Sequence, residues 1–210
     1  EGHNAYSSNP ALVESVNRHE AGHASDELNE LGMLAGSAEA LRWGREANGN
    51  PPELRTHDRF GHRIDIVEYH PSYHRLMQTA IANGMHAVPW LEERTGAHVI
   101  RAAKFMTWYG VEMGHCCPIS MTSSILPAIR HQPDLAARLE PLFVSRTYDP
   151  ANAPLEAKPG ITAGMAMTEK QGGSDVRANS TTARPVAGGG PGAEYELTGH
   201  KWFCSAPMSD

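Results

Sequence analysis

Apolar residues recur at helical spacing through much of the first part of the chain. The clearest stretch runs from Pro71 to Asn83, where apolar residues stand at positions i, i+3, i+4, i+7 and i+8. They are Tyr73, Leu76, Met77, Ala80 and Ile81. This spacing places them on one face of an α-helix, and Asn83-Gly84 is a typical helix end. The pattern predicts an amphipathic helix over residues 71–83.

Other segments before residue 150 also carry helical signals. Asn9-Pro10 predicts a helix cap and a first helical residue, with the helix continuing to about Arg18. Further helices are predicted over residues 25–48 with a break near Gly36, and over residues 95–114, 121–130 and 134–143. The apolar stripe of the helix over 95–114 is Val99, Ala103, Met106, Gly110 and Met113. Residues 53–68 are predicted to form an irregular surface excursion. Apart from this segment, the first 150 residues are predicted to be a helical bundle or layer.

The pattern changes after residue 150. Residues 149–154 and 158–160 are rich in proline and predict a linker. Residues 160–168 then alternate larger apolar with small or polar side chains, as a half-buried strand does. Strands are also predicted over residues 180–186, 194–198 and 201–205, with a hairpin tip over 187–192. We therefore predict an α+β chain, with an all-α helical domain over residues 1–157 and the incomplete beginning of an antiparallel β-sheet or β-barrel domain over residues 158–210.

Composition narrows the function classes. The chain has 210 residues and is 40% hydrophobic, which is enough for a core and for one or two domains. A net charge of -6 argues against nucleic-acid binding by this region, because such binding needs a concentrated basic surface. No apolar run approaches the roughly 20 residues that span a bilayer, and residues 1–10 lack the features of a signal peptide. We therefore expect a cytoplasmic protein with no membrane partner and with reduced cysteines.

The segment Thr168-Glu169-Lys170-Gln171-Gly172-Gly173-Ser174-Asp175 is the strongest candidate for chemistry. Gly172 and Gly173 lack a Cβ, so they can adopt positive φ and let a ligand approach the backbone. Successive N–H groups in such a turn form an anion-binding concavity, and Ser174 adds a hydroxyl. The alternative is an ordinary reverse turn between two strands.

Three other motifs are weaker. His19-Glu20-Ala21-Gly22-His23 is a formal HExxH zinc motif, but it needs a third ligand, and an exposed helical face is the better interpretation. The glycine-rich run at 188–192 lacks the following helix of a phosphate loop and predicts a hairpin tip. His70 precedes Pro71 and is expected to cap the next helix rather than bind a metal with His74. No metal site is predicted.

Several segments together resemble the acyl-CoA dehydrogenase family, and more closely its AidB-like, alkylation-response branch. They are Asn50-Pro51-Pro52-Glu53-Leu54, Cys117-Pro118-Ile119-Ser120-Met121-Thr122, the Thr168–Asp175 segment, and Gly199-His200-Lys201-Trp202-Phe203-Cys204-Ser205. The resemblance runs from about Val13 to Ser209 and concerns the N-terminal portion of such proteins. Lys170-Gln171 and Phe203-Cys204-Ser205 depart from ordinary acyl-CoA dehydrogenases and match the AidB-like branch.

The resemblance implies an FAD site made from the two later segments. It implies that Met165 and Met167 line the flavin, that Thr168 bonds the pyrimidine side of the ring, and that Gly173 and Ser174 hold the pyrophosphate. Within Phe203-Cys204-Ser205, it implies that Phe203 packs on the ring and that Ser205 contacts N5, with Cys204 between them. The catalytic base is expected beyond Asp210, so no catalytic residue is assigned.

The resemblance also leads to functional expectations. The first hypothesis is an FAD-dependent oxidoreductase that dehydrogenates an acyl-CoA between its α and β carbons, with hydride passing to flavin N5. The alternative is a flavoprotein that protects DNA from alkylation with little dehydrogenation, and a zinc hydrolase built on His19 and His23 is a third. Expected partners are an acyl-CoA or related small molecule and further copies of the chain in a tetramer, with DNA contacted only through a region beyond these residues. Residues 1–210 alone are expected to be inactive.

Overall fold

The computed structural model describes residues 2–210, and most of its regular structure is helical. The helices are α1 (Pro10–Arg18), α2 (Ser25–Ala35), α3 (Ala38–Gly49), α4 (Pro71–Ala82), α5 (Val88–Leu91), α6 (Ala97–Tyr109), α7 (Cys116–Ile129) and α8 (Pro133–Phe143). Short 3-10 turns lie at Gly22–Ala24, Leu155–Ala157 and Val176–Ala178. The strands are β1 (Glu53–His57), β2 (Arg63–Glu68), β3 (Thr182–Pro185) and β4 (Tyr195–Thr198). The predicted α+β class is confirmed.

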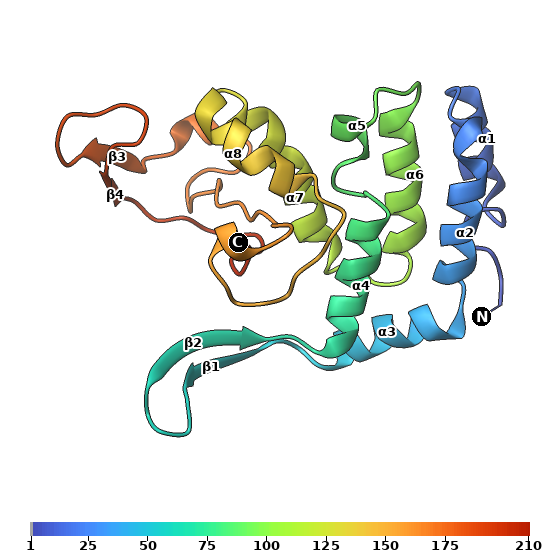
Figure 1. Ribbon diagram of the computed structural model, residues 1–210, viewed down its shortest axis with the longest axis horizontal. Helices are drawn as coiled ribbons and strands as arrows, with labels where there is room; N and C mark the ends of the chain where they lie inside the picture. The colour runs from blue at the N-terminus through green and yellow to red at the C-terminus, as the bar shows by residue number, and fades with distance from the viewer. Residues whose placement is uncertain (1) are drawn as a thin grey trace.

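The helices form a layered body around which the rest of the chain is arranged (Figure 1). Helices α2, α6 and α4 run side by side, α3 crosses beneath them, and α7 and α8 pack together on the other side. The largest buried cluster joins α2, α3, α4, α6 and α7, and it contains Leu31, Ala35, Ala40, Leu76, Met77, Ala80, Ile81, Met85, Trp108 and Ile119. The C-terminal segments lie beside α7, so α7 connects the helical layer to the region after residue 158. Among residues 2–210, we find no helix with the length and apolar content needed to cross a membrane.

Several helix predictions are confirmed. The Asn9 side chain accepts a hydrogen bond from Leu12 N at 3.2 Å, as expected for the cap of α1. Helix α4 buries the predicted apolar face, and His70 caps it by accepting from Ser72 N at 3.2 Å. The break near Gly36 separates α2 from α3, and glycine is required there because a Cβ would lie 1.7 Å from the His3 carbonyl oxygen.

The predicted apolar stripe of α6 is partly wrong: Ala103 is buried and Val99 packs against the core, but the rest of the stripe is not buried. Met106 is 59% exposed and Met113 is also exposed, whereas Lys104 is only 2% exposed. Lys104 is held inside by a salt bridge of 2.5 Å to Glu27 and by a hydrogen bond to the Asn83 carbonyl. Lys104 was not part of the predicted stripe, and its burial is tolerable only because partners on other elements pair with it.

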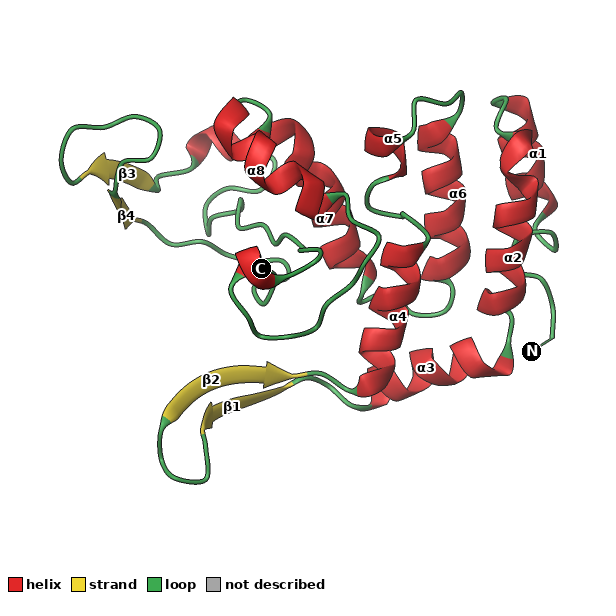
Figure 2. Cartoon of the chain, viewed as in Figure 1, coloured by secondary structure: helices red, strands yellow, loops and turns green. Residues whose placement is uncertain are grey.

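Residues 53–68 were predicted to be irregular, and this prediction is wrong. They form the antiparallel hairpin β1–β2, with Leu54 opposite Val67 and Arg55 opposite Ile66. The hairpin projects from the helical body (Figure 2), and most of its side chains are exposed on both faces. Without one buried face, a strand has no apolar alternation from which it could be recognised.

Helix α7 also starts earlier than predicted, because Pro118 lies in its first turn, where proline is tolerated.

After residue 158, only the hairpin β3–β4 forms where strands were predicted. The strands predicted over 160–168 and 201–205 are wrong; those segments meet only through isolated bridges. Residues 161–163 are all buried and residues 164–167 are all exposed, so the expected alternation is absent. At Gly164, an added Cβ would lie 2.4 Å from the Ala206 carbonyl oxygen, and the backbone of Phe203 is left-handed with φ of 54°. The close approach explains why glycine occupies position 164, and the left-handed Phe203 interrupts the extended backbone of the second segment.

Candidate functional site

The two segments that carry the predicted cofactor residues lie side by side. Met165 and Ser205 exchange two backbone hydrogen bonds, from Met165 N at 2.9 Å and from Ser205 N at 2.7 Å. Further along, Trp202 N donates to the Thr168 carbonyl at 2.8 Å. Residues more than thirty positions apart in the sequence therefore share one edge of the molecule.

The carboxylate of Glu169 holds these segments together. It is 2% exposed and accepts hydrogen bonds from Lys201 Nζ at 2.9 Å and from Gln171 Nε2 at 2.6 Å. It also accepts from Ser180 N at 2.7 Å and from Thr181 N at 2.9 Å. The Lys201 ammonium, followed by these N–H donors, holds the pKa of Glu169 far below its ordinary value. Glu169 is therefore a permanent anion that ties three stretches of chain together, and it is poorly suited to accept a proton.

The side chains on this edge suit a flat, partly apolar ligand. Met165 and Met167 are exposed, and Phe203 is 78% exposed, although all three are apolar. Among residues 2–210, the hydroxyls of Thr168 and Ser205 form no hydrogen bond. Exposed apolar side chains beside free hydroxyl donors are what an isoalloxazine ring would cover and satisfy.

The register between the segments raises a specific question of geometry. Met165 faces Ser205 and Glu169 faces Lys201. A regular antiparallel ladder through these pairs would put Ser205 and Phe203 on the face of Met165, and Thr168 on the other face. The left-handed Phe203 interrupts that ladder. Separate substitutions of Thr168 and Ser205 therefore test whether both hydroxyls contact the same ligand.

The turn after Glu169 differs from the expected positive-φ glycine pair. Neither Gly172 nor Gly173 adopts positive φ, which corrects that expectation. Gly172 is nevertheless constrained, because a Cβ there would lie 3.1 Å from Asn179 Oδ1. Gly173 has open space around it, and Ser174 is exposed, so both can be approached by a ligand. The thiol of Cys204 is free and exposed.

Sequence reasoning missed the support provided by Asn179, Ser180 and Thr181. Asn179 Nδ2 donates to the Met167 carbonyl at 2.8 Å, which fixes the backbone beside Thr168. The Asn179 Oδ1 and Thr181 Oγ1 atoms are buried without a hydrogen-bond partner in the described chain. No local spacing marks these residues, since Ser180 and Thr181 act on Glu169 mainly through their backbone N–H groups.

The formal HExxH motif does not have the geometry that zinc binding requires. Helix α1 ends at Arg18, and Glu20 is left-handed with φ of 58°, so His19 and His23 do not lie one turn apart on a helix. The two histidines were expected to lie on an exposed face of a helix, and this expectation is wrong because the motif is not helical. Within residues 2–210, no cluster of three or more histidine, cysteine or acidic side chains is arranged to hold a metal ion.

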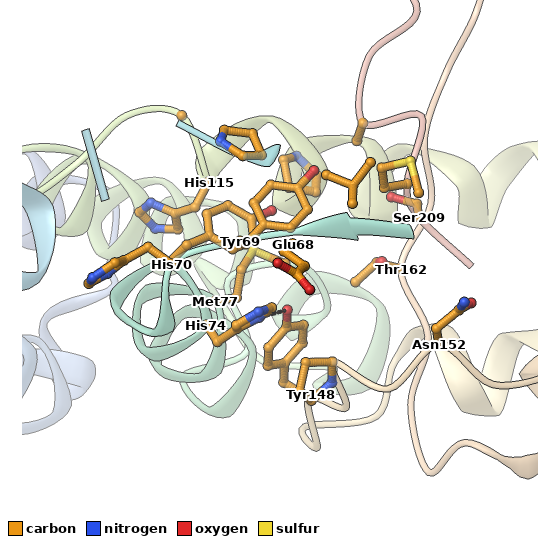
Figure 3. Close-up of a pocket in the computed structure, with 18 of the residues that line it drawn as sticks. Glu68, Tyr69, His70, His74, Met77, His115, Tyr148, Asn152, Thr162 and Ser209 are labelled. Atoms are coloured by element: carbon orange, nitrogen blue, oxygen red, sulfur yellow. Dashed lines mark hydrogen bonds between the residues drawn. The ribbon is translucent and has the colours of Figure 1, made fainter. Parts of the chain in front are cut away.

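A cavity of about 860 Å³ lies next to the segments of Thr168 and Ser205, which carry the predicted cofactor residues (Figure 3). Its walls come from the base of the β1–β2 hairpin, the starts of α4 and α7, the loop around Tyr148, and residues 206–210, which directly follow Ser205. The labelled side chains in Figure 3 include Tyr69, His74, Met77, His115, Tyr148 and Thr162. Because these residues are scattered along the chain, no motif or spacing indicated this cavity.

One wall of the cavity contains a buried pair, Glu112 and His115. The Glu112 carboxylate accepts from His115 Nδ1 at 2.9 Å, from His115 N at 2.9 Å and from Gly114 N at 2.6 Å. Although burial opposes it, hydrogen bonding to His115 and Gly114 lowers the pKa of Glu112 to about 2. The Cys116 thiol lies 3.8 Å from His115 Nε2, in an arrangement that resembles a nucleophile with its base. Burial raises the pKa of Cys116 to about 12, so the thiol stays protonated and is not a nucleophile.

Comparison with known proteins identifies the relatives of this chain. The sequence model described as "Adaptive response protein AidB N-terminal domain" matches residues 1–150. The chain belongs to the AidB N-terminal domain family. The predicted resemblance to the AidB-like branch is thereby confirmed.

Relatives of known sequence or structure cover the chain almost completely. "Putative acyl-CoA dehydrogenase AidB" of Escherichia coli (strain K12) is 46% identical over 212 residues, which are 99% of this chain and 38% of that protein. The Bd2924 apo-form has a TM-score of 0.81 at 30% identity, covering 100% of this chain and 42% of that one. Caenorhabditis elegans ACDH-11, in complex with C11-CoA, has a TM-score of 0.79 at 25% identity, covering 99% and 35%. The chain is thus related to the acyl-CoA dehydrogenase family, and it spans well under half the length of each relative.

Proposed function

We propose that the chain is part of an FAD-dependent oxidoreductase that dehydrogenates an acyl-CoA between its α and β carbons. The observation that supports this most is the edge where Thr168 and Ser205 offer free hydroxyls beside exposed Met165, Met167 and Phe203. When bound, FAD would supply the hydride acceptor, its N5 atom. The relationship to acyl-CoA dehydrogenases supports the same chemistry.

The residues of the chain would bind and orient the cofactor. Thr168 would donate to the pyrimidine side of the ring and Ser205 to N5, which favours the electron-rich reduced form. Met165, Met167 and Phe203 would shield the ring from water, and Cys204 would lie beside it. The open backbone at Gly173 and the Ser174 hydroxyl would hold the pyrophosphate. Glu169 and Lys201 would keep the two segments in register.

The acyl-CoA is proposed to enter the cavity that adjoins Ser205. The cavity begins at Ala206 and extends to α4 and α7, so an acyl group inside it would start next to the proposed flavin edge. ACDH-11 was solved with C11-CoA, which supports an acyl-CoA ligand for its relatives. No group of this chain is assigned as the acceptor of the substrate's α-proton. We also propose that the complete protein is a cytoplasmic homo-tetramer.

The test is the visible spectrum of the complete protein purified with FAD, before and after anaerobic addition of acyl-CoAs. We expect a yellow protein whose visible absorbance, due to oxidised flavin, falls when the substrate is added. Free CoA is the control, because it supplies the nucleotide without an α,β carbon pair. A protein that stays colourless with FAD, or whose flavin is unchanged by every acyl-CoA, would refute the proposal.

A second function is protection of DNA from alkylation, which the family description as an adaptive response protein favours. The net charge of -6 argues against DNA binding by residues 1–210, so we propose that any DNA contact is made by another part of the complete protein. The discriminating assay measures methyl adducts on DNA treated with a methylating agent, with and without the complete protein. Protection without flavin reduction by acyl-CoAs would favour this second function.

A further inference from the structure

The cavity in Figure 3 presents hydrogen-bonding groups that have no partner within residues 2–210. The rings of Tyr69 and Tyr73 stack with centroids 4.3 Å apart, and neither hydroxyl forms a hydrogen bond there. His74 Nδ1 shares a hydrogen bond of 2.8 Å with the Tyr148 hydroxyl, which leaves His74 Nε2 free. Tyr73 and His74 stand in the first turn of α4, whose next turn is anchored in the core by Met77. Their positions are therefore set by the fold.

These groups are uncharged at neutral pH. Burial raises the pKa values of Tyr69, Tyr73 and Tyr148, so all three remain phenols. Burial also lowers the pKa of His74, so its ring is a neutral imidazole. The wall thus offers neutral donors and acceptors rather than a charge.

The charged side chains of the lining already have partners. Lys158 pairs with Asp210 and donates to the Ala151 carbonyl at 3.0 Å. The Glu112 carboxylate is engaged by His115 and Gly114, as described above. The remaining acidic groups are also engaged: Glu68 by Arg55, Asp65 by Arg63, and Asp149 by Ala151 N. Within the described residues, an anionic ligand would therefore meet no unpaired cation in this cavity.

We propose that the cavity selects an acyl group whose far end carries a neutral hydrogen-bonding group, such as a hydroxyl or a carboxamide. This inference rests on the proposed acyl-CoA chemistry. A plain alkyl chain would displace water from Tyr73, His74 and Tyr148 without replacing its hydrogen bonds, and such sites reject ligands that lack the polar group. A carboxylate would lose its hydration without gaining a cation. Tyr73 and His74 are the residues that determine this specificity.

The experiment compares three CoA esters of equal chain length: hexanoyl-CoA, 6-hydroxyhexanoyl-CoA and adipoyl-CoA. Their dissociation constants are measured by calorimetry on the complete FAD-loaded protein, and flavin absorbance is followed in parallel. We expect 6-hydroxyhexanoyl-CoA to bind about tenfold more tightly than either of the others, as one satisfied buried hydrogen bond implies. Tyr73→Phe and His74→Leu should each reduce this preference. Tyr109→Phe is the matched control, because its exposed hydroxyl contacts Met113 and lies outside the cavity.

The outcomes separate this inference from the proposed function. Equal binding of the three esters, or tightest binding of hexanoyl-CoA, would overturn the inference even if the flavin is reduced. A preference that survives both Tyr73→Phe and His74→Leu would also overturn it. The expected preference without flavin reduction would support the cavity assignment and count against dehydrogenation. Absence of binding by all three esters would overturn both, and thermal unfolding of each variant confirms that it is folded.

Discussion

Thr122→Val tests how the helical layer is joined to the segments that we propose bind the cofactor. Thr122 is fully buried in α7, and its hydroxyl donates to the Pro118 carbonyl at 2.7 Å. The same oxygen accepts a hydrogen bond from Ala163 N at 3.0 Å. Ala163 lies two residues before Met165, so this contact fixes the start of the proposed flavin edge. Valine has nearly the same shape but cannot accept a hydrogen bond.

The expected loss follows from the buried amide that the substitution leaves unpaired. A buried donor without its acceptor costs about 1–3 kcal/mol, which is a large part of the roughly 5–15 kcal/mol that stabilises a typical domain. At about 1.4 kcal/mol for each factor of ten in an equilibrium constant, the ratio of folded to unfolded protein should fall by about one to two orders of magnitude.

Urea unfolding followed by circular dichroism measures this loss, and hydrogen exchange at Ala163 N localises it. Thr122→Ser, which keeps the hydroxyl, should retain the protection of the Ala163 amide. Ser124→Ala is the control, because the Ser124 hydroxyl is exposed and bonds only within its own helix. A Thr122→Val protein as stable as wild type, with Ala163 N equally protected, would show that this hydrogen bond does not join the two regions.

Further substitutions test other parts of the structure. Burial lowers the pKa of His86 from 6.5 to about 4, so its contribution to stability is complete above about pH 6.5 and is lost as the pH falls through about 4. As the pH falls from about 6.5 to about 4, the free energy of unfolding of wild type in urea should decrease by about 3 kcal/mol more than that of His86→Gln. Equal decreases in the two proteins would contradict this prediction. Glu169→Gln should weaken FAD binding about tenfold in the complete protein, because it releases Lys201. Glu196→Gln, at an exposed position, is the control and should leave FAD affinity unchanged. Wild-type FAD affinity in Glu169→Gln would refute the positioning role of Glu169. Lys104→Ala should lower the free energy of unfolding by about 1–3 kcal/mol, because it removes one of the two cations that pair with Glu27 and leaves the Asn83 carbonyl without its donor, and a loss below about 0.5 kcal/mol would refute that assignment.

The helices were predictable wherever one face alone is buried. Helix α4 shows this, because its apolar residues match its buried side chains. Helix α6 does not, since Lys104 is stabilised inside by Glu27 and Asn83, which belong to distant parts of the sequence. The hairpin β1–β2 was missed because neither face is buried. Periodicity records burial on one face, and it fails where tertiary partners decide burial.

The candidate site was predictable only where a motif carries it. The resemblance identified the segments of Thr168 and Ser205, and the structure shows that they are adjacent. It could not identify Asn179, whose side chain bonds a backbone carbonyl. The cavity was also beyond reach, because Tyr69, His115 and Tyr148 meet only after the chain has folded.

The most direct test of the flavin assignment is titration of the complete apoprotein with FAD, comparing wild type with Thr168→Ala and with Ser205→Ala. Flavin fluorescence quenching gives the dissociation constant, and Ser174→Ala provides a comparison at the proposed pyrophosphate end. If both hydroxyls hold one isoalloxazine ring, each substitution should weaken binding about tenfold and change the flavin spectrum. Wild-type affinity in Thr168→Ala alone would mean that Thr168 lies on the opposite face, and no binding of FAD by wild type would contradict the assignment altogether.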